Sequence, residues 1–69
     1  MSMAWRISGD LREWRLANAL TQEEAARKAK LSTRTLHAAE RGVPVRIKSV
    51  RAIARMMGRR PLDIATLAE

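Results

Sequence analysis

The chain has no cysteine, so neither a disulfide framework nor thiol chemistry is available to it. Glycine and proline are scarce, and two tryptophans stand without any tyrosine or phenylalanine. No hydrophobic run approaches the ~20 residues of a membrane span, and the N-terminal sequence MSMAWRISGD has no apolar signal region. We therefore expect a cytoplasmic protein with no membrane partner. Its 69 residues support a single domain with a small core and low stability.

Acidic residues are scarce through the middle of the chain. Lys and Arg together number 14 against seven Asp and Glu, which gives a net charge of +7. Between residues 25 and 60, Glu40 is the one acid among eleven basic residues. A clustered positive field favours a polyanionic partner, most often nucleic acid. The alternative is that the charge serves solubility alone.

Residues suited to catalysis are also few. His37 is the single histidine, and the positions four residues before and after it are Thr33 and Arg41, which are not acids. The sequence has no metal-ligand spacing and no glycine-rich phosphate loop. The neighbouring carboxylates Glu23 and Glu24 are explained better by the dipole of a helix that they begin. We therefore predict that the protein is not an enzyme and uses no metal or cofactor.

Local sequence signals divide the chain into short helices. Helix-forming residues dominate, and β-branched or aromatic runs with period two are absent, so we predict an all-α fold. The five expected helices lie at about residues 9–19, from just after Thr21, at 33–41, at 47–57 and from Pro61. They form one domain at residues 9–67, preceded by an N-terminal extension at residues 1–8.

Residue types at the expected helix starts are typical of caps. Ser8 or Asp10 is expected to cap the first helix. Thr21 and Glu24 have the spacing of a capping box for the second helix. Ser32 is a natural N-cap for the third helix, and the very short connection before it predicts a sharp angle between the second and third helices.

The third expected helix has two different sides at about 100° per residue. Leu36 and Ala39 fall on the side expected to pack against the core. The opposite side carries Thr33, Arg34, His37, Ala38 and Arg41. Arginine can reach two acceptors of guanine, Thr and His offer polar atoms, and Ala can contact a thymine methyl. The alternative is an ordinary solvated face, but the helix before it, the tight turn and the positive field favour base reading.

This region resembles the lambda-repressor/Cro-like, or XRE-like, family of helix-turn-helix DNA-binding domains. The matching residues are Leu11, Arg15, Leu20, Thr21, Gln22, Glu23, Glu24, Ala26, Leu31, Ser32, Thr35, Leu36, Glu40, Arg41, Gly42, Ile53, Ala54, Met57 and Gly58. The resemblance covers about residues 9–66. It implies a compact five-helix domain in which the helix-turn-helix spans residues 21–41.

The resemblance also implies roles for individual residues. The base-reading set, taken together with the exposed side described above, is Thr33, Arg34, His37 and Ala38. The DNA-backbone set is Gln22, Ser32, Thr35, Arg41, Arg46 and Lys48, with Gln22 also bracing the recognition helix. Arg15 and Glu40 match a structural ion pair between the first and third helices.

Three positions depart from the family pattern or have no counterpart in it. Lys30 stands where the family usually has glycine, so either Lys30 adopts a strained left-handed conformation or the turn differs. Ala25 stands where the family usually has leucine, which leaves a thinner core unless a tryptophan fills the gap. Trp14 is expected in the core, whereas Trp5 is interpreted as a core residue, a dimer contact or an exposed side chain.

These observations predict a small sequence-specific DNA-binding transcriptional regulator that binds double-stranded DNA at a two-fold operator as a homodimer. A Cro-like repressor, a restriction-modification controller and the antitoxin of a toxin pair are the bacterial or phage roles that fit so short a chain. The alternative is a protein-interaction module that binds a toxin, an activator or polymerase. The apolar segment Ile64–Leu67 is expected to finish the core or to form the dimer surface.

Overall fold

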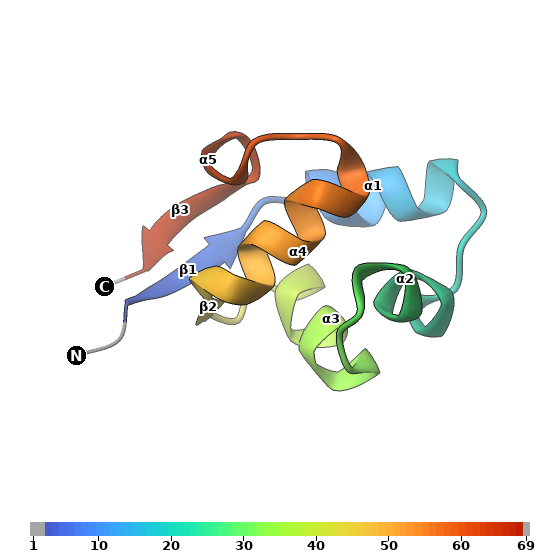
Figure 1. Cartoon of the computed structure of the whole chain (residues 1–69), viewed down its shortest axis with the longest axis horizontal. Coiled ribbons are helices and arrows are strands. Elements are labelled where there is room, and N and C mark those ends of the chain that lie inside the picture. Colours follow the sequence, from blue (N-terminus) through green and yellow to red (C-terminus); the bar gives the residue numbers. More distant parts are fainter. Residues whose placement is uncertain (1–2, 69) are drawn as a thin grey trace.

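The computed structural model describes residues 3–68, and these form five helices and three strands (Figure 1). In chain order the elements are β1 (Ala4–Ile7), α1 (Asp10–Ala17), α2 (Gln22–Ala29), α3 (Thr33–Glu40), β2 (Val45–Arg46), α4 (Ile47–Met57), α5 (Pro61–Ile64) and β3 (Ala65–Ala68). The five predicted helices are confirmed, although α5 is a single turn.

The all-α prediction is wrong because the described residues also contain a three-stranded antiparallel sheet with strand order β2-β1-β3. β1 pairs with β2 on one side, where Ala4 lies opposite Arg46, and with β3 on the other side, where Ala4 lies opposite Ala68. The segment predicted as an N-terminal extension, residues 1–8, thus supplies the central strand, while residues 1 and 2 lie outside the described part. Trp5 and Ile7 share one face of β1, as the period-two geometry of a strand requires, and Ile7 is buried.

Two of the predicted helix caps are confirmed. In the capping box of α2, the Glu24 N–H donates to Thr21 Oγ1 at 3.1 Å and the Thr21 N–H donates to Glu24 Oε1 at 2.9 Å. These hydrogen bonds hold the pKa of Glu24 below its usual value. At the start of α3, the Thr35 N–H donates to Ser32 Oγ at 3.1 Å. Each bond satisfies a backbone group that has no partner within the first helical turn.

The predicted cap of α1 is wrong. Gly9 occupies the N-cap position, and no side chain there accepts a hydrogen bond from the helix. Ser8 Oγ instead donates to Asp10 Oδ2 at 3.2 Å. The chain enters α1 directly from β1, and the Ser8 N–H donates to the Ile64 carbonyl at 2.8 Å. Residues before α1 are therefore positioned by the sheet and not by a helix cap.

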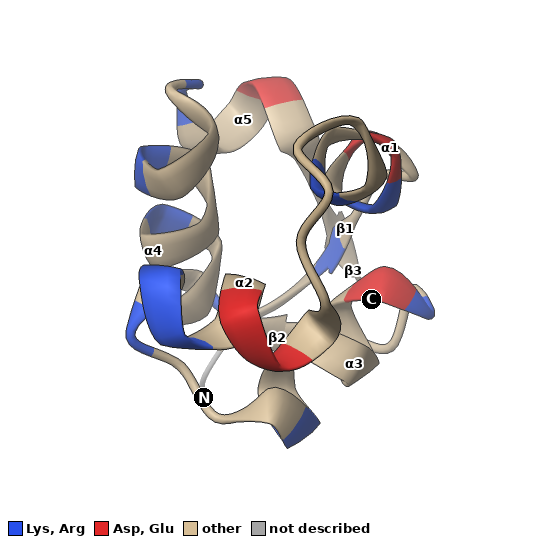
Figure 2. Cartoon of the chain, turned by 90° about the vertical axis from the view of Figure 1, so that its right-hand side faces the viewer, with Lys and Arg blue, Asp and Glu red and all other residues tan. Residues whose placement is uncertain are grey.

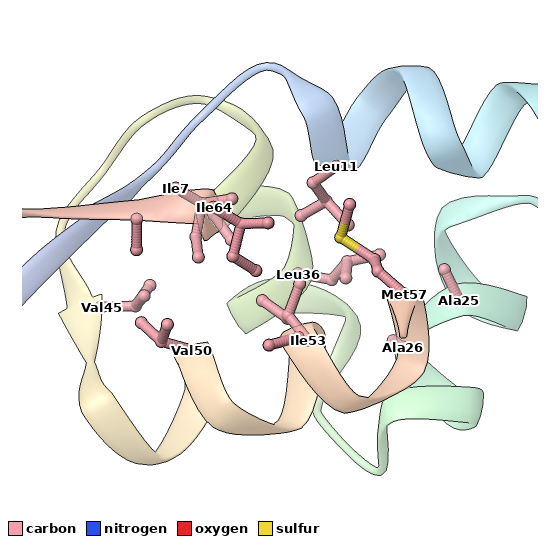
Figure 3. Close-up of a cluster of buried hydrophobic side chains, with 13 residues drawn as sticks. Ile7, Leu11, Ala25, Ala26, Leu36, Val45, Val50, Ile53, Met57 and Ile64 are labelled. Carbon is pink, nitrogen blue, oxygen red and sulfur yellow. The ribbon is translucent and has the colours of Figure 1, made fainter. Parts of the chain in front are cut away.

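The hydrophobic core lies between the sheet and helices α1 to α4 (Figure 3). Its largest fully buried side chains are Leu11, Leu36, Val50, Ile53 and Ile64. Ala25 is also fully buried, and its small side chain lets α2 approach the core closely. Trp14 is partly buried against this cluster, as predicted. Burial of Ile64 and Ala65 means that the end of the chain completes the core, whereas Leu67 remains 47% exposed.

Lys30 adopts the left-handed conformation that the family pattern assigns to glycine. It caps the C-terminus of α2 with φ 59° and ψ 42°. Its N–H donates to the Arg27 carbonyl at 3.1 Å, and the Leu31 N–H donates to the Ala26 carbonyl at 2.8 Å. The turn between α2 and α3 is therefore retained, and a residue with a Cβ in this conformation costs roughly 1–2 kcal/mol.

Replacing Lys30 with glycine is expected to raise the free energy of unfolding by roughly 1 kcal/mol, because relief of the strain exceeds the greater backbone entropy of glycine in the unfolded chain. Thermal denaturation followed by circular dichroism measures the change. Lys30→Ala removes the same charge but keeps the Cβ, and should give no such gain. Lys28→Gly, in the right-handed last turn of α2, should instead destabilise by about 1 kcal/mol. Equal effects of glycine at positions 28 and 30 would contradict the strain argument.

Candidate nucleic-acid interface

Helix α3 is held at a sharp angle to α2 by a connection of three residues, Lys30, Leu31 and Ser32. The left-handed Lys30 reverses the chain, Leu31 turns its side chain onto the edge of the core, and Ser32 caps α3. The two helices pack against each other along their small and apolar sides, which include the buried Ala26 and Leu36. The geometry is that of a helix-turn-helix.

The structure confirms the predicted division of α3 into two sides. Leu36 and Ala39 are completely buried. Of the predicted base-reading set, Thr33, Arg34 and His37 are exposed and Ala38 is half-buried. Of the predicted backbone set on or next to α3, Ser32 and Arg41 are exposed and Thr35 is half-buried. The exposed side of α3 therefore offers hydroxyl, imidazole and guanidinium groups to an outside partner.

A buried ion pair fixes the C-terminal end of α3. Arg15 on α1 contacts Glu40 on α3 through two guanidinium nitrogens, and its third nitrogen donates to the Leu20 carbonyl at 3.0 Å. The side chains of Arg15 and Glu40 are only 11% and 4% exposed. Gln22 Nε2 donates to the same carboxylate, at 3.1 Å from Glu40 Oε1. The predicted ion pair is present, and Gln22 connects α2 to it, so three helices are joined at one carboxylate.

The charged state of Glu40 depends on this network. Burial of the carboxylate raises its pKa, but hydrogen bonds from Arg15 and Gln22 together with the charge of Arg15 outweigh burial and hold the pKa below its usual value. The same hydrogen bond to Glu40 raises the pKa of Arg15. Both partners are therefore ionised at neutral pH, and the position of α3 relies on charge-assisted hydrogen bonds, which are stronger than neutral ones.

Two shallow depressions flank the exposed side of α3. The first, of about 290 Å³, lies between α3 and the start of α4. It brings together members of both predicted DNA-contact sets and adds Ser49, which the sequence analysis missed. Its lining residues are Arg34, Thr35, Ala38, Pro44, Val45, Arg46 and Ser49. Arg34 and Arg46, twelve positions apart in the sequence, therefore border the same concave surface.

The second depression, of about 300 Å³, lies between α2 and the start of α3. Ser32 and Thr33 line it together with Glu23 and Arg27 from α2. Arg27 was not predicted as a site residue, since its position beside α3 follows from the angle between the helices and not from sequence spacing. Ser49 was missed for the same reason. Glu23 places one negative charge at this border of the exposed side.

Lysine and arginine also line α4 and the end of α2, as Figure 2 shows, whereas acids lie at the start of α2 and the end of α3. A depression between α2 and α4 contains Lys30, Lys48, Arg51 and Arg55. Ser49 borders both this depression and the one beside Arg34, so the two surfaces are continuous. Ser49 lies where they meet, and its neighbour Lys48 lines the depression between α2 and α4.

Two further observations concern metal-binding groups and the length of the helices. Within residues 3–68, no group of His, Asp and Glu side chains is arranged to hold a metal ion. No helix in the described part of the chain has the length and apolar character needed to cross a membrane.

Comparison with known proteins gives one family match. A family model described as helix-turn-helix matches residues 11–64, which includes α1 to α5 almost completely. Neither the curated proteins nor the solved structures give a match. The matched range contains the α2–α3 pair, the Arg15–Glu40 ion pair and both depressions that border α3.

Proposed function

The chain belongs to the XRE/lambda-repressor-like helix-turn-helix family, and from this premise we propose that it is a sequence-specific transcriptional regulator that binds a two-fold DNA operator as a dimer. Helix α3 and its C-terminal cap residue Arg41, together residues 33–41, enter the major groove. Thr33, Arg34, His37 and Ala38 read base edges, and the protein performs no catalytic step.

The observation that carries this proposal is the position of Arg34. Its side chain is exposed on α3, and it borders a depression together with Ala38 and Arg46. A helix in the major groove needs a guanidinium or amide that reaches base edges, a small side chain that permits close approach, and basic groups at the flanking phosphates. One concave surface supplies all three.

Contacts with the DNA backbone are expected on both sides of α3. Helix α4 begins without a side-chain cap, so its first N–H groups have no side-chain acceptor. A phosphate at a helix N-terminus interacts with such groups and with the helix dipole. Arg46 and Lys48, at the same helix start, are exposed and add positive charge. The remaining members of the backbone set are Gln22, Ser32, Thr35 and Arg41, of which Thr35 borders the same depression as Arg46 and Ser32 borders the one beside α2.

Selection of binding sites from random duplex DNA tests the proposal, followed by titration of the selected duplex at two salt concentrations. We expect a two-fold sequence, preferred over random DNA by ~10³ or more, and an affinity that falls steeply with salt because several phosphates are neutralised. Weak binding without sequence preference would contradict the proposal. It would favour a protein-interaction module that uses the same fold and positive surface.

Replacing Lys48 with alanine is expected to weaken binding to all DNA sequences by similar factors and to reduce the slope of log affinity against log salt by about one. The reason is that Lys48 neutralises a phosphate without reading a base. Titrations of selected and random duplexes at several salt concentrations measure the slope. Arg59→Ala, at an exposed position just after the C-terminal cap of α4 and outside both depressions that border α3, is the matched control and should leave the slope unchanged. An unchanged slope for Lys48→Ala would remove it from the contact surface.

A further inference from the structure

A basic furrow lies between the C-terminal end of α2 and one side of α4, and we call it the α2–α4 furrow. It consists of two depressions of about 270 and 310 Å³, which share Ala29, Lys30, Ala52 and Arg55. Small side chains form its floor, since Ala29 is buried and Ala52 is half-buried. Its walls carry five exposed cations, which are Lys28, Lys30, Lys48, Arg51 and Arg55.

The cations of α4 form one row along the helix. Lys48, Arg51 and Arg55 are separated by three and four residues, so they lie on one side of α4, where Figure 2 shows Lys and Arg repeated along the helix. At ~1.5 Å per residue the row is ~10 Å long. One strand of a DNA duplex carries a phosphate every ~3.4 Å along the helix axis, so the row matches about three consecutive phosphates.

Interactions within the chain do not account for these charges. None of the five cations takes part in the two ion pairs found among the described residues. No acidic residue from the described part of the chain lines either depression. Lys48 lies in the first turn of α4, which contains no acid and where the helix dipole disfavours a cation. An anionic partner from outside the chain would therefore relieve repulsion that the fold leaves in place.

The backbone of Lys30 gives independent evidence that the furrow has a function. Lys30 lines both depressions and holds the left-handed conformation, with φ 59°, which strains a residue with a Cβ. Glycine would adopt this conformation without strain. Residues held in strained conformations concentrate at functional sites. Here the strained residue supplies an ammonium group to the furrow, which glycine could not do.

The lining of the furrow favours the backbone of duplex DNA over other anionic partners. Protein interfaces depend on large apolar or aromatic side chains at their centre. None of the exposed large hydrophobic side chains of the described residues lines the furrow; these are Met3, Leu16, Val43, Leu62 and Leu67. The lining also lacks an aromatic side chain on which unpaired bases could stack. Positive charge over small side chains suits phosphates instead.

We propose that the α2–α4 furrow binds the backbone of a second DNA duplex, without sequence preference, while α3 holds the first duplex. The inference rests on the proposed DNA reader for the first duplex and adds a site that this reader does not need. Ser49 borders both the furrow and the depression beside Arg34. The two duplexes therefore lie on adjacent surfaces of one chain, which can join two DNA segments.

Amide chemical shifts locate the second duplex directly. The full chain is saturated with its selected duplex and then titrated with a random duplex of about ten base pairs, one helical turn. We expect the amide signals of Ala29, Lys30 and Ala52 to move as random duplex is added, whereas those of β1 and β3 stay in place. A titration in which no furrow amide moves would overturn the proposal. Movement with a polyglutamate peptide but not with random duplex would identify an acidic protein partner and would also overturn it.

Two matched double variants measure the contribution of the furrow charges. Arg51→Ala with Arg55→Ala removes two cations from the furrow, and Arg6→Ala with Arg59→Ala removes two exposed cations that line neither depression. The furrow variant should bind the second duplex about tenfold or more weakly and lower the salt slope of that step by about two, because two phosphate contacts are lost. It should keep the sequence preference of α3. Equal losses in both double variants would mean that net charge alone attracts the second duplex.

Lys30→Gly separates binding from stability. This variant is expected to be more stable than the wild type, but it should bind the second duplex several-fold more weakly because the furrow loses one cation. A purely structural role of Lys30 would not weaken binding in a more stable protein. Unchanged binding of the second duplex to Lys30→Gly would overturn the functional reading of the strain.

The outcomes distinguish this inference from the proposed function. If the chain has no sequence preference but random duplex alone moves the furrow amides, the furrow is supported and the DNA reader is contradicted. If a sequence is selected but random duplex moves none of these amides, the reader stands and the furrow is wrong. A single duplex bent onto the furrow would move the amides before any second duplex is added and increase energy transfer between dyes at its two ends. That result would overturn the second duplex.

Discussion

Replacing Glu40 with alanine is expected to reduce the free energy of unfolding by ~3–5 kcal/mol, because it leaves the guanidinium of Arg15 buried without its partner. The guanidinium is held between α1, the Leu20 carbonyl and α3, and its side chain is only 11% exposed. A domain of this size is stable by only roughly 3–10 kcal/mol. Urea denaturation followed by circular dichroism should therefore show a protein that is partly or wholly unfolded at room temperature.

A double substitution distinguishes loss of the ion pair from loss of packing. Arg15→Met with Glu40→Met removes both charges and keeps apolar volume, so it should recover most of the stability that Glu40→Ala loses. Its DNA affinity should remain low, because Gln22 then has no acceptor on α3 and the recognition helix is less firmly held. If the double variant were as unstable as Glu40→Ala, packing around residue 40 would be responsible, and the ion-pair argument would be wrong.

Acid titration tests the contribution of the Glu40 carboxylate to stability without replacing Arg15. The pKa of Glu40 in the folded protein lies below the ordinary value of a glutamate carboxyl, about 4.5. Its contribution to stability is therefore complete above about pH 4.5 and is lost as the pH falls through the lower folded-state pKa. The denaturation midpoint of the wild type should fall with acid in this window. Glu40→Gln has no carboxyl at this position, so its midpoint should depend less on pH there.

The positions of α2, α3 and α4 were predictable from the sequence because each of these helices carries its own local signals. Thr21 with Glu24 predicts the start of α2, and Ser32 predicts the start of α3. Gly58 occupies the left-handed C-cap of α4, which places the end of that helix at Met57. These signals act within three or four residues along the chain, so they remain visible without knowledge of the tertiary fold.

The strands were not predicted because their signals are too short. β1 offers one alternation, Trp5 and Ile7 around Arg6, which is weak evidence over four residues. β2 has only two residues, and β3 follows a helical turn without a break. Their pairing joins positions far apart in sequence, such as Trp5 with Leu67. The apolar segment Ile64–Leu67 was expected either to finish the core or to form the dimer surface, and its buried first half and exposed second half fit a strand at the border of the sheet.

The candidate interface was predictable where it depends on one helix and not where it depends on two. The exposure of Thr33, Arg34 and His37 follows from the 3.6-residue period of α3. Ser49 and Arg27 reach the same surface from α4 and α2, through helix angles that the sequence does not encode locally. Both residues extend the surface that a DNA duplex would meet.

Replacing Arg34 with alanine is expected to cost ~1–3 kcal/mol at the selected DNA site and much less on random DNA, so sequence preference should fall by a comparable factor. The guanidinium is exposed and takes part in neither ion pair found among the described residues. It therefore stays available for two hydrogen bonds to a guanine, and its removal should leave the fold intact. Titration of selected and random duplexes at one salt concentration measures both affinities.

The matched control for Arg34 is Arg55→Ala, which removes the same exposed guanidinium from α4, on the surface turned toward α2. Both variants lower the net charge equally, so a general electrostatic effect should appear in both. Base reading predicts that only Arg34→Ala reduces the ratio of selected to random affinity, and that repeated selection with this variant yields relaxed preference at one position in each half-site. Equal losses on both duplexes would mean that Arg34 contacts a phosphate. Base reading would then depend on Thr33, His37 and Ala38, whose shorter side chains require α3 to lie deeper in the groove.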